Sequence, residues 1–317
     1  MLRAREPQLL NAERAQRMLD APGFEEAAKL LTDCGYPDMA QMKADEIERT
    51  LAERRNAVLA EMASLAPDKS IVTAFRVKYD YHNVKAILKA AAMDSDPKHL
   101  LTEAGRVPAE KLLGAYQESR YAELPSVLGK AMEEARTVLA RTANPQMADL
   151  ILDQACYEEM KAAAREAECP FLEGYVQLLI DSTNLKSAVR TLRMHKDADF
   201  LQSVLLSGGS VSDSRIAAAG DREALAGLFQ NSKLAEAAAL GAEAAAGGRM
   251  TAFEKACDNA VTAYLKDAKL IGFGPETLAA YLAAVEGETT AVRMILTGRL
   301  AGIAPDTIRE RLRDLYA

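Results

Sequence analysis

Apolar residues recur every three to four positions along most of this 317-residue chain, the spacing of helices with one buried face. Serine, aspartate or proline stands where most of these stretches begin, and glycine or proline follows where they end. The expected helices cover residues 8–19, 24–34, 45–65, 70–92, 109–116, 125–141, 145–167, 171–195, 198–205, 213–219, 221–229, 234–246, 251–270, 275–296 and 305–315. The pattern therefore predicts an all-α fold.

One segment favours a strand when it is read alone. From Ile71 to Tyr81 every second residue is β-branched or aromatic, as is typical of strands. Related segments at 176–180 and 278–284 do not alternate, and Val84 and Leu88 share one face of a helix. We therefore predict a helix here as well.

Three segments, at residues 75–89, 176–190 and 283–297, resemble one another. The first two share an aspartate, an asparagine three positions later and a lysine two positions after that. The third keeps an acid and a base but has Ala291 in place of asparagine. The matching positions are Asp80, Asn83 and Lys85, then Asp181, Asn184 and Lys186, then Glu288 and Arg293. A repeat of about a hundred residues indicates a small helical domain used three times.

A helix start follows each segment, at Val107-Pro108, at Val211-Ser212 and, as we interpret the third copy, at Ile303-Ala304-Pro305. Proline in a first turn, or serine at a cap, deals with backbone N–H groups that have no helical partner. The repeat predicts three similar domains of about a hundred residues, at 1–118, 119–220 and 221–317.

Composition limits the classes of function. The chain is 49% hydrophobic and 27% charged, with a net charge of −7, which is ordinary for a soluble protein and argues against a nucleic-acid binder. No apolar stretch approaches the ~20 residues that span a bilayer. The four cysteines are not clustered, which favours reduced thiols over disulfides or zinc. We expect a cytoplasmic protein that spans no membrane.

Motifs for chemistry are missing from the sequence. It has no phosphate-binding loop, no dinucleotide fingerprint, no HExxH and no GxSxG. Asp80 and His82 lie two apart, so on a helix they point away from each other and cannot share a metal ion without a ligand from elsewhere. Gly208-Gly209 reads as a turn between helices. We expect no catalytic residue, no cofactor and no metal.

The acid and the asparagine of each repeat lie three positions apart, on one helix face. Asparagine is a mediocre helix former, so its place in mid-helix needs a reason. Three interpretations stay open: the pair fixes the register against a neighbouring helix or helix end, which we favour, it contacts a partner protein, or, least favoured, it takes part in catalysis. The bases Lys85, Lys186 and Arg293 lie on another face, solvated or available to an acidic partner.

From end to end the chain resembles the C subunit of prokaryotic V-type and A-type rotary ATPases and ATP synthases, the counterpart of the eukaryotic d subunit. The resemblance rests on Arg3–Leu10, on Lys78–Lys85, on Ile180–Lys186 running into Lys196–Leu201 and Gly208-Gly209, on Val292–Arg299 and on Pro305–Leu312. Each stretch is weak alone, and the set is specific.

The resemblance implies three helical domains around a pseudo-threefold axis, forming a funnel. It implies a non-catalytic connector of the central stalk, between the central shaft and the membrane ring of proteolipid subunits. The chain would then be peripheral to the membrane through its complex, with no small-molecule substrate. The alternatives are a general helical scaffold of another complex and a helical enzyme with a cleft between units.

Overall fold

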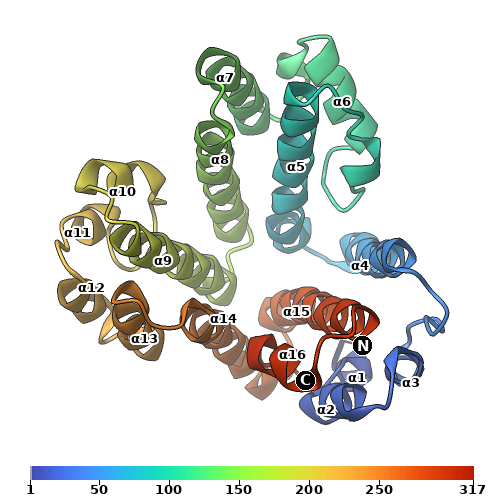
Figure 1. The fold of residues 1–317 in the computed structure, drawn as a ribbon. Helices are drawn as coiled ribbons and strands as arrows, with labels where there is room; N and C mark the ends of the chain where they lie inside the picture. Colours follow the sequence, from blue (N-terminus) through green and yellow to red (C-terminus); the bar gives the residue numbers. More distant parts are fainter. Residues whose placement is uncertain (1) are drawn as a thin grey trace. The chain divides into compact units, whose positions relative to one another are not determined.

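The protein is described here by a computed structural model that covers residues 2–317, and within them every regular element is helical (Figure 1). The α-helices are α1 Leu2–Arg5, α2 Ala12–Asp20, α3 Phe24–Lys29, α4 Ala44–Leu65, α5 Lys69–Ala92, α6 Ala109–Gln117, α7 Ser126–Thr142, α8 Pro145–Glu166, α9 Pro170–Arg193, α10 Ala198–Val204, α11 Asp213–Ala217, α12 Arg222–Phe229, α13 Ala235–Ala245, α14 Met250–Lys266, α15 Pro275–Leu300 and α16 Pro305–Arg311. Short 3-10 helices lie at η1 Glu6–Gln8, η2 Thr32–Cys34, η3 Lys98–Leu100, η4 Tyr121–Glu123 and η5 Asp267–Leu270. The predicted all-α fold is confirmed.

The segment that alternates like a strand lies inside helix α5. Asp68 caps this helix by accepting a hydrogen bond from the backbone N–H of Ser70. Helix α5 contacts α6, α7 and α8, so its side chains are buried on several faces. A helix that is buried on several faces can carry bulky apolar residues at alternating positions as well as at helical spacing. This burial explains why the sequence of α5 alternates like a strand.

The chain forms two compact units. One contains the residues up to Arg55 together with Gln177–Ala317, and the other contains Asn56–Val176. The borders fall within α4 and α9. In the second unit α5 and α7 both pack along α8.

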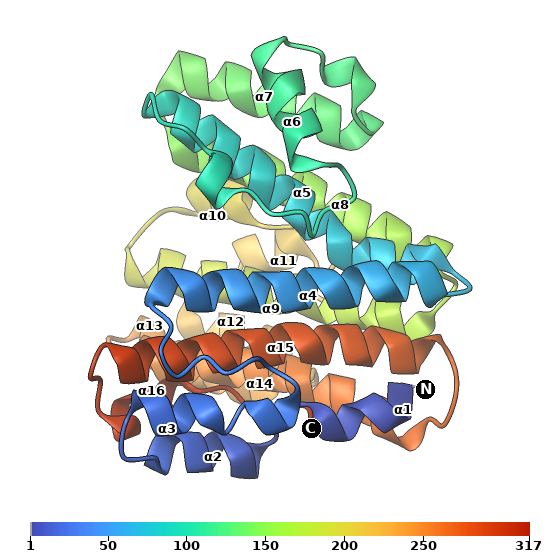
Figure 2. The ribbon, with the colours of Figure 1, turned by 90° about the vertical axis from the view of Figure 1, so that its right-hand side faces the viewer.

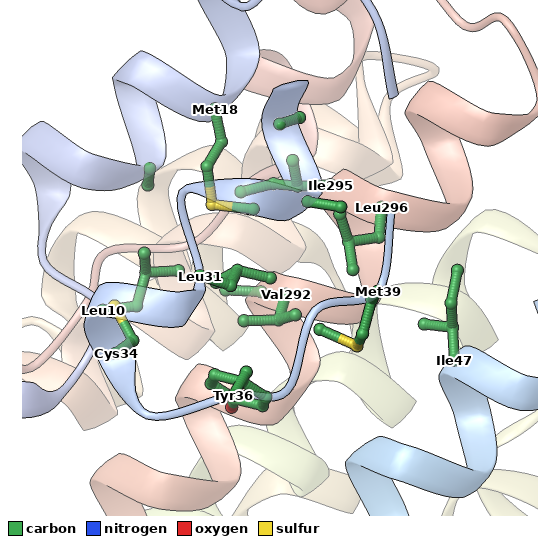
Figure 3. Close-up of a cluster of buried hydrophobic side chains, with 14 of the residues drawn as sticks. Leu10, Met18, Leu31, Cys34, Tyr36, Met39, Ile47, Val292, Ile295 and Leu296 are labelled. Atoms are coloured by element: carbon green, nitrogen blue, oxygen red, sulfur yellow. The ribbon is translucent and has the colours of Figure 1, made fainter. Parts of the chain in front are cut away.

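The first unit has a hydrophobic core that joins the two ends of the chain (Figure 3). Leu10, Met18 and Leu31, from the N-terminal segment, pack against Val292 and Ile295 of α15. In Figure 2 helices α2 and α3 run along α15.

A second core of this unit lies among α9 to α14. It contains Leu185 and Val189 of α9, with Phe229 at the end of α12 and Phe253 of α14. All four side chains are buried.

The long helices α5, α9 and α15 each head a group of helices. We call α5–α8 the first group, α9–α14 the second group, and α15 and α16 with α1–α3 and α4 up to Arg55 the third group. The third group thus combines segments that the sequence had placed in domains one and three. The boundaries after residues 118 and 220 stay predictions.

Candidate functional site: a buried carboxylate in each group

Each long helix carries one buried acid. Asp80 of α5, Asp181 of α9 and Glu288 of α15 are 0%, 3% and 2% exposed. Each carboxylate accepts a hydrogen bond from the backbone N–H of an aliphatic residue. These contacts are Val107 N to Asp80 at 3.0 Å, Val211 N to Asp181 at 3.3 Å and Leu10 N to Glu288 at 2.7 Å.

The three N–H donors occupy the same place relative to a helix start. Each directly precedes an N-cap residue: Pro108 for α6, Ser212 for α11 and Asn11 for α2. Each carboxylate therefore binds the backbone just before the start of a helix. In the first two groups that helix comes later in the sequence than the acid, and in the third group it is α2, near the N-terminus.

The predicted helix start after the third segment is present, because α16 begins at Pro305 with Ala304 as its N-cap, but Ile303 does not supply the N–H donor to the acid. The residue that takes this role is Leu10, while Ile303 is 43% exposed. The sequence could not reveal this, because the partner of Glu288 lies 278 residues earlier in the chain.

Glycines bring the loop close to the carboxylate in the first two groups. A Cβ on Gly105 would lie 2.3 Å from an Asp80 oxygen, and one on Gly209 would lie 2.2 Å from an Asp181 oxygen. Both glycines stand two residues before the N–H donor, so the shared spacing Gly-x-Val was a signal that our sequence reading missed. Gly209 serves this close approach in the turn that we predicted at Gly208-Gly209.

In the first group a half-buried arginine completes the site. The Arg106 guanidinium donates to Asp80 at 2.6 Å and to Glu159 of α8 at 2.8 Å, and the Tyr81 hydroxyl also donates to Glu159. Burial raises the pKa of Asp80, against the lowering effect of the hydrogen bonds from Val107 and Arg106. Although burial lowers the pKa of Arg106, its hydrogen bonds to Glu159 and Asp80 outweigh burial and raise it.

The second group satisfies its acid with neutral donors. Asp181 accepts from both the backbone N–H and the hydroxyl of Ser210, at 3.0 and 2.5 Å, besides Val211. Three hydrogen bonds to one carboxylate compensate for its lost hydration.

In the third group Glu288 accepts from the Tyr36 hydroxyl at 2.7 Å, and Arg54 of α4 lies 3.4 Å from the same oxygen. Burial raises the pKa of Glu288, while the hydrogen bonds from Tyr36 and Leu10 and the charge of Arg54 oppose the rise. Burial, together with the charge of Glu288, raises the pKa of Tyr36 as well, which keeps this hydroxyl protonated as a donor.

The two asparagines bind the backbone of the same loops. Asn83 exchanges two hydrogen bonds with Thr102, at 2.8 and 2.9 Å, and Asn184 exchanges two with Leu206, both at 2.8 Å. Ala291 is buried at the corresponding position of α15 and has no polar side chain for such contacts.

The three bases are paired within their own groups. Lys85 contacts Asp153 of α8, Lys186 contacts Asp258 of α14 and Arg293 contacts Glu48 of α4. These side chains are partly exposed, so each pair adds little to stability. The three bases thus remain partly solvated while paired, and their contact with a partner protein stays a prediction.

These arrangements are suited to hydrogen bonding within the chain. Among residues 2–317 there is no group of three or more His, Cys, Asp or Glu side chains placed to hold a metal ion. The thiols of Cys156 and Cys257 are buried, and burial raises the pKa of each to about 12. The part of the chain described also has no helix long and apolar enough to cross a membrane.

A family profile described as ATP synthase (C/AC39) subunit matches residues 1–311. The chain belongs to this family. It is 23% identical to the C subunit of the V-type sodium ATPase from Enterococcus hirae, over all of this chain and 97% of that relative. It is 23% identical to the C subunit of the A-type ATP synthase from Pyrococcus abyssi, over 99% of this chain and 89% of the relative. The C subunit of the V-type ATP synthase from Thermus thermophilus is 24% identical over 60% of each chain.

Membership of the C/AC39 family confirms the resemblance inferred from the sequence. The relatives are named as one subunit of a larger ATPase or ATP synthase. Of the predicted site residues, the structure brings each acid together with a backbone loop and each base together with an acid of a neighbouring helix. Their role in registry or in partner contact stays a prediction. Arg106, Glu159, Tyr36 and Arg54, which complete two of the sites, were not identified from the sequence.

Proposed function

We propose that this chain is the non-catalytic connector of the central stalk in a rotary V/A-type ATPase or ATP synthase. It would join the central shaft to the membrane ring of proteolipid subunits and so couple ATP turnover to ion movement. It would act on the cytoplasmic side, held at the membrane by its complex. The observation that carries the proposal is the family match over residues 1–311, with a relative of the same family aligned along nearly its whole length.

The helical groups have properties that suit a part under mechanical load. A coupling element must transmit torque without deforming, and close-packed cores are stiff. Each long helix also holds a distant loop through a buried carboxylate, at Asp80, Asp181 and Glu288. We propose that these contacts maintain the register of the helices, and that three such groups form the pseudo-threefold funnel expected for the family.

Affinity capture tests this function. The tagged chain, expressed in its native host and purified from solubilised membranes, should bring down shaft and ring subunits in fixed proportion. Capture of an unrelated soluble complex by the tagged chain would favour a general scaffold and reject the proposal.

Coupling is tested on the purified complex in vesicles. After removal of this chain, the soluble head should still hydrolyse ATP, while ATP-driven ion uptake is lost. Uptake should return when the wild-type chain is added back. Full ion uptake without the chain would contradict a connecting role.

A further inference from the structure

The connection between α14 and α15 is longer than its two counterparts. Each counterpart joins the last helix of one group to the long helix of the next and has three residues, 66–68 between α4 and α5 and 167–169 between α8 and α9. The connection from α14, which ends at Lys266, to α15, which begins at Pro275, has eight residues, 267–274. In Figure 2 it lies at the right-hand end of α15, beside the start of the chain. Its first four residues form the 3-10 helix η5, which contacts α14 and α15, and residues 271–274 complete the turn into α15.

This connection exposes two large apolar side chains. Leu270 is 91% exposed and Phe273 is 95% exposed. Ala268, which lies nearer to α14 in the sequence, is fully buried and anchors the start of the connection. Isolated exposed apolar residues are common, but two such side chains at one apex form a ready contact for a partner. A phenylalanine can bury about 150–250 Å² on binding.

The backbone of the apex is held in place. The Arg3 guanidinium donates hydrogen bonds to the carbonyl oxygens of Ala268 and Ile271. The Thr277 hydroxyl donates to the carbonyl of Gly274 at 2.8 Å, and Gly274 has φ +134°, a conformation that favours glycine. A loop fixed in one conformation loses little entropy when it binds.

Two exposed lysines and two acids, one of them paired, lie around residues 267–274. Lys266 and Lys269 are exposed on its N-terminal side. The Asp267 carboxylate contacts Lys233 at 3.3 Å, which leaves Glu276 as the acid on the C-terminal side. With Asp267 paired to Lys233, the two exposed lysines exceed Glu276 by one positive charge, on a chain whose net charge is −7.

We propose that Leu270 and Phe273 form an anchor that inserts into an apolar pocket, rimmed by carboxylates, on another protein subunit of the rotary complex. The proposal rests on the proposed function. The exposed lysines complement an acidic rim. A protein pocket fits better than a bilayer surface, because a backbone fixed in one conformation aids insertion into a shaped pocket.

The test uses the membrane complex from which this chain has been removed, immobilised for binding measurements. The double variant Leu270→Ser with Phe273→Ser should bind at least about tenfold more weakly than the wild-type chain. Its melting temperature should be unchanged, because both side chains are exposed. The matched control is Met93→Ser, which alters a 77% exposed apolar residue in the first group and should bind like the wild type.

Charge reversal provides an independent reading. Lys266→Glu combined with Lys269→Glu should weaken binding and reduce its sensitivity to salt. Wild-type affinity of the apolar double variant would overturn the anchor. Binding of the wild-type chain to phosphatidylglycerol vesicles that the apolar double variant loses would also overturn it, in favour of a lipid surface. Failure of the wild-type chain to bind the complex would instead count against the proposed function.

Discussion

A carboxylate that loses its water needs hydrogen bonds or an opposite charge in return, and the three long helices meet this need with different residues. Asp80 receives a half-buried arginine, Asp181 receives a serine, and Glu288 receives a tyrosine and an arginine from α4. The common element is the backbone N–H that precedes a helix cap. What repeats along the chain is therefore the acceptor and its backbone donor, while the side-chain partners vary.

Replacing Asp181 by alanine tests the cost of losing one such acceptor. The backbone N–H groups of Ser210 and Val211 would lose their buried partner, which costs roughly 1–3 kcal/mol. Urea unfolding of Asp181→Ala should show this loss, together with a lower melting temperature. The matched control is Glu243→Ala, which alters an exposed acid on α13 of the same group. It should change the free energy of unfolding by less than about 0.5 kcal/mol. An unchanged melting temperature combined with weaker binding to the complex would place Asp181 at a partner interface instead.

The raised pKa of Glu288 predicts how the stability of the chain depends on pH. Because its pKa is raised above the ordinary value of 4.5, the folded chain retains a proton there that the unfolded chain releases as pH rises past 4.5. The contribution of Glu288 to the free energy of unfolding therefore falls as pH increases through this window. Relative to the wild type, Glu288→Gln should become steadily more stable from about pH 4.5 upward, by about 1.4 kcal/mol per unit of raised pKa. Urea unfolding at a series of pH values measures the difference, and a flat difference would show that the pKa is not raised.

At the scale of elements, the starts and ends of helices follow local chemistry, whereas their partners do not. Asn11, Ser212 and Asp221 cap α2, α11 and α12 through side-chain oxygens, as their residue types predict. Helix α2, however, packs on α15, at the other end of the sequence. The third group is thus completed by the N-terminal segment.

Removal of the segment up to Asp20 tests this completion. The truncated chain loses Leu10 and Met18 from the shared core, and Glu288 loses its backbone donor. Hydrogen–deuterium exchange should become faster in α15 and α16, while α5–α8, which belong to the other compact unit, serve as the internal control. Unchanged protection of α15 would show that the N-terminal segment does not stabilise it.

At the scale of the whole molecule, the two ends of the chain meet. The Tyr316 hydroxyl donates to Glu6 at 3.3 Å, and Leu315 belongs to the same hydrophobic core as Leu10. When the two termini are close together, a short linker can join them and new termini can be made at another position in the chain. The order of segments along the chain is then one of several that suit this fold.

A circular permutant checks this. A short Gly/Ser linker would join Ala317 to the first residue, and the chain would open between Gly220 and Asp221, which are exposed and leave the cap of α12 intact. Its melting temperature should lie within about 4 °C of the wild type. A second permutant, opened between the buried Asn184 and Leu185, is the control and should fail to fold. Unfolding of the first permutant would mean that the natural order of segments is required.

The sequence by itself determined the helical class, most helix starts, the family and the repeated acid, because these depend on residue types and short spacings. Even the strand-like stretch from Ile71 to Tyr81 was resolved by comparison with its other copies. Only the tertiary structure decided which donors reach each acid. Leu10 and Tyr36 meet Glu288 across more than 250 residues, and Arg106 meets Glu159 across 53. Such pairs form because packing brings the helices together, and no local spacing records a contact between segments so far apart.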